Sequence, residues 1–232
     1  MSTIVYPTEK ILELAFAAHR VNASYVKQGR FNYEDPSKNV WSNKELIGHT
    51  AAMTMAPEDT MFLPWVPENF KPIEVTDADR AGVEKTHKFF RRYTMLILGD
   101  SLNEFQQDMY KAYSTEECGV KQFGYFAYIP SFIERESEDI AYTRKLKTEY
   151  ASSVHLTGNS FHGKVEIIKR IFLAEWDTFL YFAGTDGKLV SFSKKDKYEV
   201  ESVLDITAKI KSQDTERETQ LPMTRMNYVK VF

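Results

Sequence analysis

The tetrapeptide Gly184-Thr185-Asp186-Gly187 constrains the fold more than any other stretch of this 232-residue sequence. Its glycine and aspartate residues can adopt the positive φ angles that a tight β-hairpin requires. The flanking segments suit strands, because 178–183 has apolar residues on both faces and 188–193 alternates Val190 and Phe192 with Leu189 and Ser191. The sequence therefore predicts a hairpin over 178–193, with a sheet built around it.

Three other segments near this hairpin also have the pattern of strands. Residues 164–172 precede it and end at a turn that contains Trp176. Residues 205–211 alternate between apolar and polar side chains, and a charged loop over 212–218 leads into a last strand ending at Phe232. A long first strand, a tight hairpin, a spacer and two further strands is the order of a five-stranded OB barrel. A small SH3-like barrel, which has a similar number of strands, is the alternative.

The earlier part of the chain has helical periodicity. Apolar spacing predicts five helical segments, namely 8–26, 44–55, 76–98, one beginning at Asp100 or Ser101, and 131–151. The last follows an aromatic segment over 120–129, which Pro130 should break or kink. We therefore predict an α+β fold, with a mainly helical region over 1–151 and a small five-stranded OB-like β-barrel over 152–232.

Local sequence also predicts where several of these helices begin. The N-cap candidates are Thr8, Ser42, and either Thr76 or Asp77. Glu45 lies three residues after Ser42 and would close a capping box with it.

Prolines interrupt the chain between the second and third helices. Four of the eight prolines fall within residues 57–72, so this stretch cannot form a regular helix or a central strand. Its many apolar residues predict an ordered, packed strap. The alternative is an exposed proline-rich ligand for a protein partner.

Composition narrows the class of protein. The net charge is −3, and residues 152–232 hold 12 Lys and Arg against 11 Asp and Glu, so any anion-binding surface must come from local arrangement. A single cysteine, Cys118, excludes an intramolecular disulfide and suits a reducing compartment. No apolar run approaches the roughly 20 residues of a membrane helix. We expect a cytoplasmic protein that does not associate with a membrane.

The sequence carries no signal for catalysis, a metal or a cofactor. The five histidines share no ligand spacing, and Cys118 has no cysteine partner for a zinc site. Walker, dinucleotide-binding and nucleophile-elbow motifs are absent from the sequence. Acidic pairs such as Glu116-Glu117 lie where solvated charge is ordinary. We therefore expect no enzyme activity and no cofactor.

The barrel region carries a resemblance in two stretches. These are GKVEIIKRIFLAEWDTFLYFAGTDGKLVSF and DITAKIKSQDTERETQLPMTRMNYVKVF. Together they resemble the carboxy-terminal OB-like module of bacteriophage DNA-metabolism proteins, over residues 161–232. The resemblance implies binding of single-stranded nucleic acid, DNA in the first instance, and no reaction. Two departures are Pro222-Met223, where a bulge or edge kink is expected, and the lack of the zinc-binding cysteines that relatives often carry.

The expected binding residues follow from the OB architecture, in which strands 2 and 3 and the adjacent loops bind oligonucleotides. Aromatic rings there stack on bases and lysines contact phosphates. On the barrel the candidates are Trp176, Phe179, Tyr181, Phe192, Lys194, Lys195, Lys209, Lys211 and Arg217. A second candidate surface is the basic half of the 76–98 helix, with Lys88, Arg91 and Arg92.

Several alternatives stay open at this stage. Either Phe179 with Tyr181 or Leu180 with Phe182 must face the barrel core, and periodicity does not decide between them. Basic residues of the last two strands could line a merely solvated outer surface. Trp176 is the residue whose loss should weaken binding most. The competing function is a protein–protein adaptor that docks a replication or host protein through the barrel or the 57–72 strap.

Overall fold

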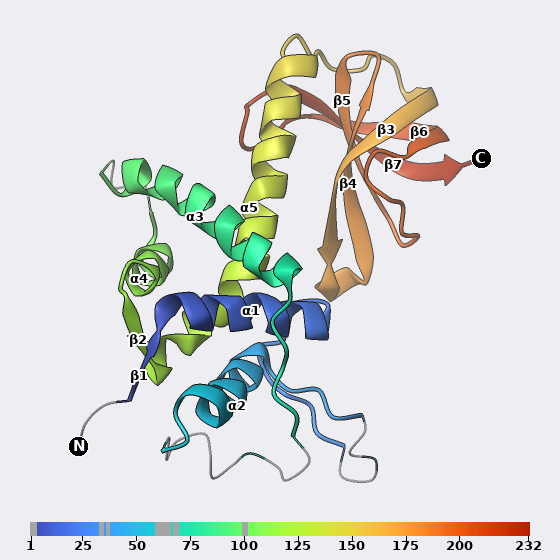
Figure 1. The fold of residues 1–232 in the computed structure, drawn as a ribbon. Coiled ribbons are helices and arrows are strands. Elements are labelled where there is room, and N and C mark those ends of the chain that lie inside the picture. The colour runs from blue at the N-terminus through green and yellow to red at the C-terminus, as the bar shows by residue number, and fades with distance from the viewer. Residues whose placement is uncertain (1–3, 33–34, 36–37, 59–65, 67–69, 99–101) are drawn as a thin grey trace. The chain divides into compact units, whose positions relative to one another are not determined.

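A computed structural model describes residues 4–32, 35, 38–58, 66, 70–98 and 102–232, with the backbone alone described for 92–98. The chain forms two compact units, Met1–Glu136 and Ser137–Phe232. The division falls inside helix α5 (Phe123–Glu149), whereas the sequence placed it after residue 151. The fold is α+β as predicted, with helices in the first unit and a closed five-stranded barrel in the second (Figure 1).

The first unit is built around a helical core. Its elements are β1 (Val5–Pro7), α1 (Thr8–Asn22), α2 (Asn43–Met55), α3 (Asp77–Leu98), α4 (Glu104–Tyr113), β2 (Glu117–Gly119), the short 3-10 turn Val120–Gln122 and the first half of α5. Helix α1 packs against α2 and α3 and buries one apolar face completely, including Ile11, Leu12 and Ala15. Strands β1 and β2 pair antiparallel, with Tyr6 opposite Cys118.

Two of the predicted N-caps are confirmed. Ser42 Oγ accepts a hydrogen bond from the Glu45 amide at 3.2 Å, and Glu45 Oε2 accepts one from the Ser42 amide at 2.9 Å. Thr76 and Asp79 form the same reciprocal pair at the start of α3. The third cap was wrong: Thr8 is itself the first residue of α1, and no side chain caps that end.

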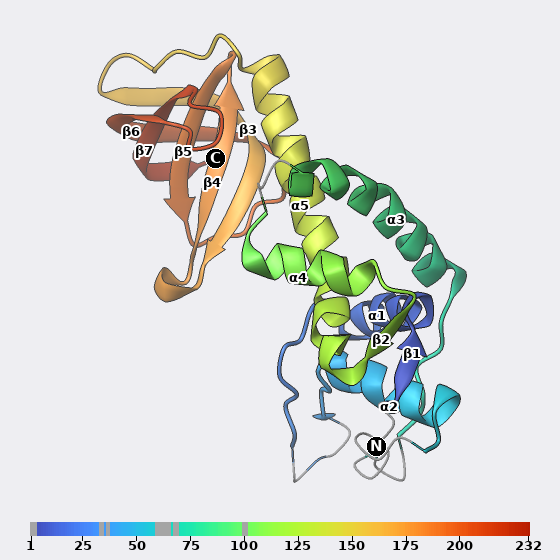
Figure 2. The ribbon, with the colours of Figure 1, turned by 90° about the vertical axis from the view of Figure 1, so that its left-hand side faces the viewer.

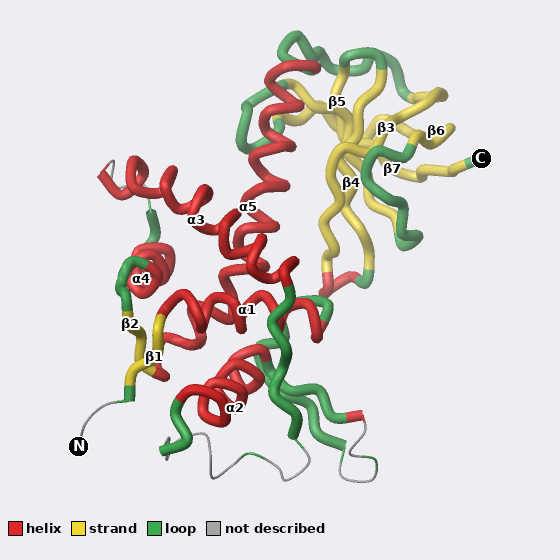
Figure 3. The backbone as a smooth tube through the Cα atoms, in the orientation of Figure 1, coloured by secondary structure: helices red, strands yellow, loops and turns green. Residues whose placement is uncertain are grey.

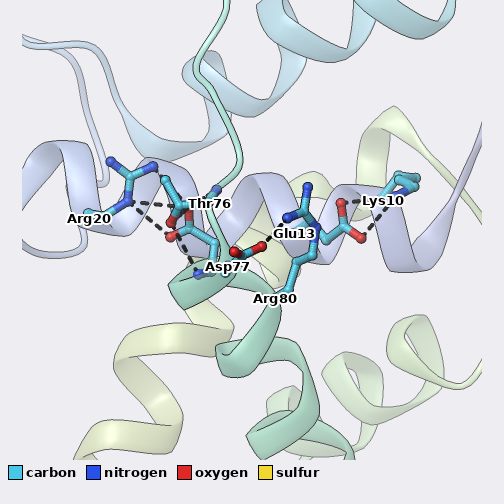
Figure 4. Close-up of polar contacts among 7 residues, drawn as sticks. Lys10, Glu13, Arg20, Thr76, Asp77 and Arg80 are labelled. Carbon is cyan, nitrogen blue, oxygen red and sulfur yellow. Dashed lines mark hydrogen bonds and ion pairs between the residues drawn. The ribbon is translucent and has the colours of Figure 1, made fainter.

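An ion pair joins α1 to the beginning of α3 (Figure 4). Arg20 donates to Asp79 through Nε at 3.1 Å and through Nη2 at 2.9 Å, and its Nη2 also reaches the Glu74 carbonyl. Asp79 is only 3% exposed. Burial acts to raise the pKa of Asp79, but hydrogen bonds from Arg20 and Thr76 outweigh it and hold the pKa below its ordinary value.

The end of α1 and the start of α4 differ from the predicted boundaries. Helix α1 ends at Asn22 because Ala23 adopts the left-handed conformation, with φ of 54°. Helix α4 begins at Glu104 because Asn103 and Gln106 form a capping box. Asp100 and Ser101, and most of the 57–72 strap, lie outside the described residues.

Pro130 does not end a helix, so the break that was one of the two expected effects is wrong. It lies inside α5, which continues through it to Glu149. A proline inside a helix removes one backbone hydrogen bond and costs about 3 kcal/mol. Buried aromatic residues on both sides of it, Phe126 and Phe132, belong to the core of the first unit and offset that cost.

The second unit is an OB-like barrel. Its strands are β3 (Ser160–Leu173), β4 (Thr178–Thr185), β5 (Lys188–Lys194), β6 (Val203–Thr215) and β7 (Pro222–Val231), in the closed order β3-β4-β5-β7-β6 (Figure 2). The pairs are antiparallel except β5–β7, which is parallel. A parallel pairing of the third and fifth strands is incompatible with the antiparallel meander of an SH3-like barrel. It matches the Greek-key connection of the OB fold.

The β4–β5 hairpin forms where the sequence predicted it, with the turn at Asp186 and Gly187, whose φ angles are 45° and 71°. Gly184 has a different role from the one expected. It lies inside β4, and a Cβ atom there would collide with the Tyr150 ring. Pro222 begins β7 with regular pairing. The register irregularities lie elsewhere in the β6–β7 pair, at Thr207/Lys209 and Ile210/Ser212.

The second half of α5 covers part of the outside of the barrel. Its residues Tyr142, Leu146 and Tyr150 form a buried cluster with Ile168, Leu189 and Met223 of three strands, and Phe182 packs against it. Ion pairs at 2.6 Å, Lys145–Glu166 and Lys169–Asp139, fix the helix to β3. Strand β4 is therefore apolar on both faces because one faces the barrel core and the other faces α5.

Candidate functional site

Two of the predicted binding residues lie inside the barrel. Tyr181 and Phe192 are fully buried and stack on each other at 5.3 Å between ring centroids. The Tyr181 hydroxyl donates to the Asp196 carbonyl and accepts from the Tyr198 amide, so it anchors the loop after β5. The choice left open by the sequence is decided in favour of Tyr181 as core. Neither ring is accessible for base stacking.

Other predicted residues lie at one end of the barrel, where most of the cations are paired with carboxylates. Phe179 is half-buried, 5.0 Å from the Phe172 ring and beneath the Arg170 guanidinium. Lys194 pairs with Asp196 at 3.1 Å, and Arg170 pairs with Glu199 at 3.2 Å. We call the charged residues here the rim cluster: Arg170, Lys194, Lys195, Lys197, Asp196 and Glu199. Of its four cations, Lys195 alone lacks an ion pair within the described chain.

Trp176 lies at the end of the β3–β4 hairpin, in the turn Ala174–Trp176, and this hairpin extends beyond the neighbouring strands (Figure 3). The indole is 65% exposed, as expected for a side chain outside the core. Exposed Glu175 and Asp177 flank it. These carboxylates disfavour the approach of a phosphate backbone.

The remaining predicted cations are dispersed. Arg217 is exposed in the loop between β6 and β7. Lys88 and Arg91 are exposed on α3 in the first unit, and Glu84 lies one turn before Lys88. The side chain of Arg92 lies outside the described residues.

Lys209 and Lys211 belong to a larger surface, which the register of three adjacent strands defines. Inward residues of β3, β6 and β7 are packed in the barrel core, so the alternate residues face outward. The outward cations are Lys164 of β3, Lys209 and Lys211 of β6, and Arg225 and Lys230 of β7, all exposed. We call these five residues the basic face.

The basic face is not neutralised. None of its five cations forms an ion pair with any carboxylate in the part of the chain that the structure describes. Across 160–165, 205–211 and 225–232, the one acidic side chain is Asp205. In the strand register Lys164 lies opposite Asp205, and Lys209, Arg225 and Lys230 lie opposite uncharged residues. The surface therefore has an excess of positive charge that suits a polyanionic ligand.

Two strongly exposed aromatic residues accompany these cations. Tyr228 is 76% exposed, with the Lys209 ammonium 5.6 Å from its ring centroid. Phe232 is 78% exposed, and its ring lies 6.5 Å from that of His162. Sequence reasoning missed both residues, and Lys164, because it looked for aromatic residues on the second and third strands. They are identified from the structure, in which the rings are exposed and the neighbouring cations have no ion pair within the described chain.

A cleft of 310 Å³ lies between α5 and β3 in the barrel unit. Its lining includes Lys145, Lys169 and Arg170. Each of these three cations already has a carboxylate partner, respectively Glu166, Asp139 and Glu199. Glu138 and Glu201 in the same lining have no ion-pair partner within the described chain, so the uncompensated charge of the cleft is negative and disfavours an anionic ligand.

Reactive and metal-binding groups are not assembled elsewhere in the described residues. Burial raises the pKa of Cys118 to about 11, which keeps it a thiol at neutral pH. Within the described chain, no three His, Cys, Asp or Glu side chains are grouped to hold a metal ion. No described helix has both the length and the apolar character needed to cross a membrane.

Comparison with known proteins gives no match to a family model, a curated protein or a solved structure.

Proposed function

We propose that this protein binds single-stranded nucleic acid through the basic face of its barrel, without catalysing a reaction. The observation that carries the proposal is the set of five unpaired cations on three adjacent strands, next to two exposed aromatic rings. Cations neutralise phosphates, and aromatic rings stack on bases that are not paired in a duplex. The OB-like order of the strands agrees with this class of ligand.

DNA is the first ligand to test. The resemblance of residues 161–232 to modules of phage DNA-metabolism proteins supports DNA over RNA, and supports a role in a phage-type replication or recombination system. The binding surface we propose differs from the usual OB face, because α5 covers part of the outside of β4 and β5.

Fluorescence anisotropy of the full chain tests the proposal. The probes are labelled single-stranded DNA and RNA of about 16 nucleotides, the upper end of the site size of one OB fold, and a duplex of equal length. We expect the single strands to bind more tightly than the duplex. Equal affinity for the duplex would mean that the surface binds polyanions in general and does not select single strands. No binding at low salt would contradict the proposal.

A protein-docking function is the second candidate, and a specific observation favours it. The end of the β3–β4 hairpin combines exposed Trp176 and Phe172 with the acidic side chains of Glu175 and Asp177. Tryptophan is enriched among the residues that dominate protein interfaces. A partner would need an apolar pocket with a basic rim. Such an interface would respond weakly to salt compared with binding of a nucleic acid.

A further inference from the structure

Tyr228 has a backbone conformation that its residue type disfavours. Its φ angle is 53°, in the left-handed region, where a bulky non-glycine residue is strained. It lies in the irregular part of the β6–β7 pairing, where Thr207 pairs with Lys230 and Lys209 pairs with Asn227. Glycine is the usual residue at a left-handed bulge position. The strain has no compensation from burial, because the side chain is the second most exposed large apolar or aromatic residue in the described chain.

The bulge determines the position of the Tyr228 ring. Met226 and Val229 both pack in the barrel core, so the extra residue in the bulge turns Tyr228 to the outside, while Asn227 beside it is half-buried. The Tyr228 ring then stands beside the Lys209 ammonium on the central strand of the basic face. Its hydroxyl has no hydrogen-bond partner among the described residues. The ring is thus held on a strand next to a cation. Its interaction with the Lys209 ammonium is exposed to solvent, where a cation–π contact is weak, and does not compensate for the strained backbone.

We propose that Tyr228 is a base-stacking site, at which the strained bulge presents the ring to one unpaired nucleobase while Lys209 contacts an adjacent phosphate. This inference rests on the proposed function and specifies its ligand. A polyanion without bases would engage the cations alone. A duplex would offer no free base face away from its ends. The site therefore selects single strands that carry bases.

Replacing Tyr228 by Gly separates this role from a structural one. Glycine adopts a φ of 53° without strain, so Tyr228→Gly should unfold at the same temperature as the unaltered chain or at a higher one. The same variant should bind a labelled single-stranded 16-nucleotide DNA about tenfold more weakly, since one stacked base is lost. Tyr228→Phe keeps the ring and should bind normally. An abasic oligonucleotide of equal length should bind the unaltered chain and Tyr228→Gly equally.

Two controls keep the outcomes distinct. If the glycine substitution destabilises β7, Tyr228→Asn is tested in place of Tyr228→Gly, because Asn also adopts the left-handed conformation readily. Trp176→Ala removes an exposed ring outside the basic face and should leave affinity unchanged. Normal binding by Tyr228→Gly, together with weak binding by Lys211→Gln/Lys230→Gln, would overturn the stacking site and leave the proposed function standing. Failure of the unaltered chain to bind any oligonucleotide would overturn both.

Discussion

Replacing Lys211 and Lys230 by glutamine tests how many phosphates the basic face contacts. Both side chains are exposed, and neither has an ion-pair partner in the described chain. Their replacement therefore leaves no buried group unsatisfied, and the stability of the barrel should change by less than about 0.5 kcal/mol. Any loss of affinity in this double variant then reports on ligand contacts.

The expected magnitude follows from the number of cations. If all five contact phosphates, the logarithm of the binding constant should fall with the logarithm of salt concentration with a slope of about −3.5, which is about 0.7 per contact. Raising salt from about 50 to about 200 mM would then weaken binding roughly 100-fold. With two contacts removed the slope should be about −2, and the same change in salt should cost roughly 20-fold.

Anisotropy titrations of labelled single-stranded DNA at four or more salt concentrations give both slopes. The matched control is Lys194→Gln/Lys197→Gln, which removes two charges from the same barrel at the rim cluster, where both lysines are paired with carboxylates. The control should keep the slope of the unaltered chain. Equal slopes for all three proteins, or an equal reduction in the control, would refute the assignment of phosphate contacts to the basic face.

Three further predictions concern other parts of the chain. Asp79→Ala should lower the unfolding free energy of the first unit by about 2–4 kcal/mol in denaturant titrations, because Asp79 accepts hydrogen bonds from both Arg20 and Thr76. The pKa of Asp79 is lower in the folded chain than in the unfolded chain. Its contribution to stability is therefore complete above the unfolded pKa, near 4, and is lost as the pH falls through the lower folded pKa. An undiminished difference in unfolding free energy between the variant and the unaltered chain at pH 2 would contradict this expectation. Cys118 should resist alkylation at pH 8, because a thiol of pKa about 11 is only about 0.1% thiolate at that pH, and it should react when the first unit unfolds. Rapid alkylation of the folded chain would argue against the burial of Cys118. Trp176→Ala should leave both melting temperature and DNA affinity nearly unchanged, and a tenfold loss of affinity would instead restore Trp176 as the stacking residue.

The features that sequence predicted well are those determined within a few residues. The Ser42–Glu45 capping box and the turn at Asp186-Gly187 depend on local hydrogen bonds and on local φ angles, so residue types at fixed spacing identify them. The OB-like strand order followed because these local signals separated the strands. The same reasoning could not show that β1 and β2 exist, because three-residue strands are too short for a periodic pattern.

The errors arose where distant contacts override local preference. Helix α5 continues through Pro130 because flanking aromatic residues are buried in the core, and no local signal reports that burial. The sequence could not show which face of β4 points into the barrel. Helix α5 covers the face opposite the barrel core, so both faces of the strand are apolar. Tyr228 was missed because neither glycine nor asparagine marks its positive φ. The functional surface was thus the least predictable part of the fold.

The most direct test of the central claim is a map of the backbone amide shifts of the full chain during titration with single-stranded DNA. We expect the largest changes on β6 and β7, around Lys209, Lys211, Arg225 and Tyr228, and on β3 near Lys164. The hairpin end around Trp176 should change little. Changes confined to that hairpin end, or to α3 of the first unit, would contradict the claim that the basic face of the barrel binds the strand.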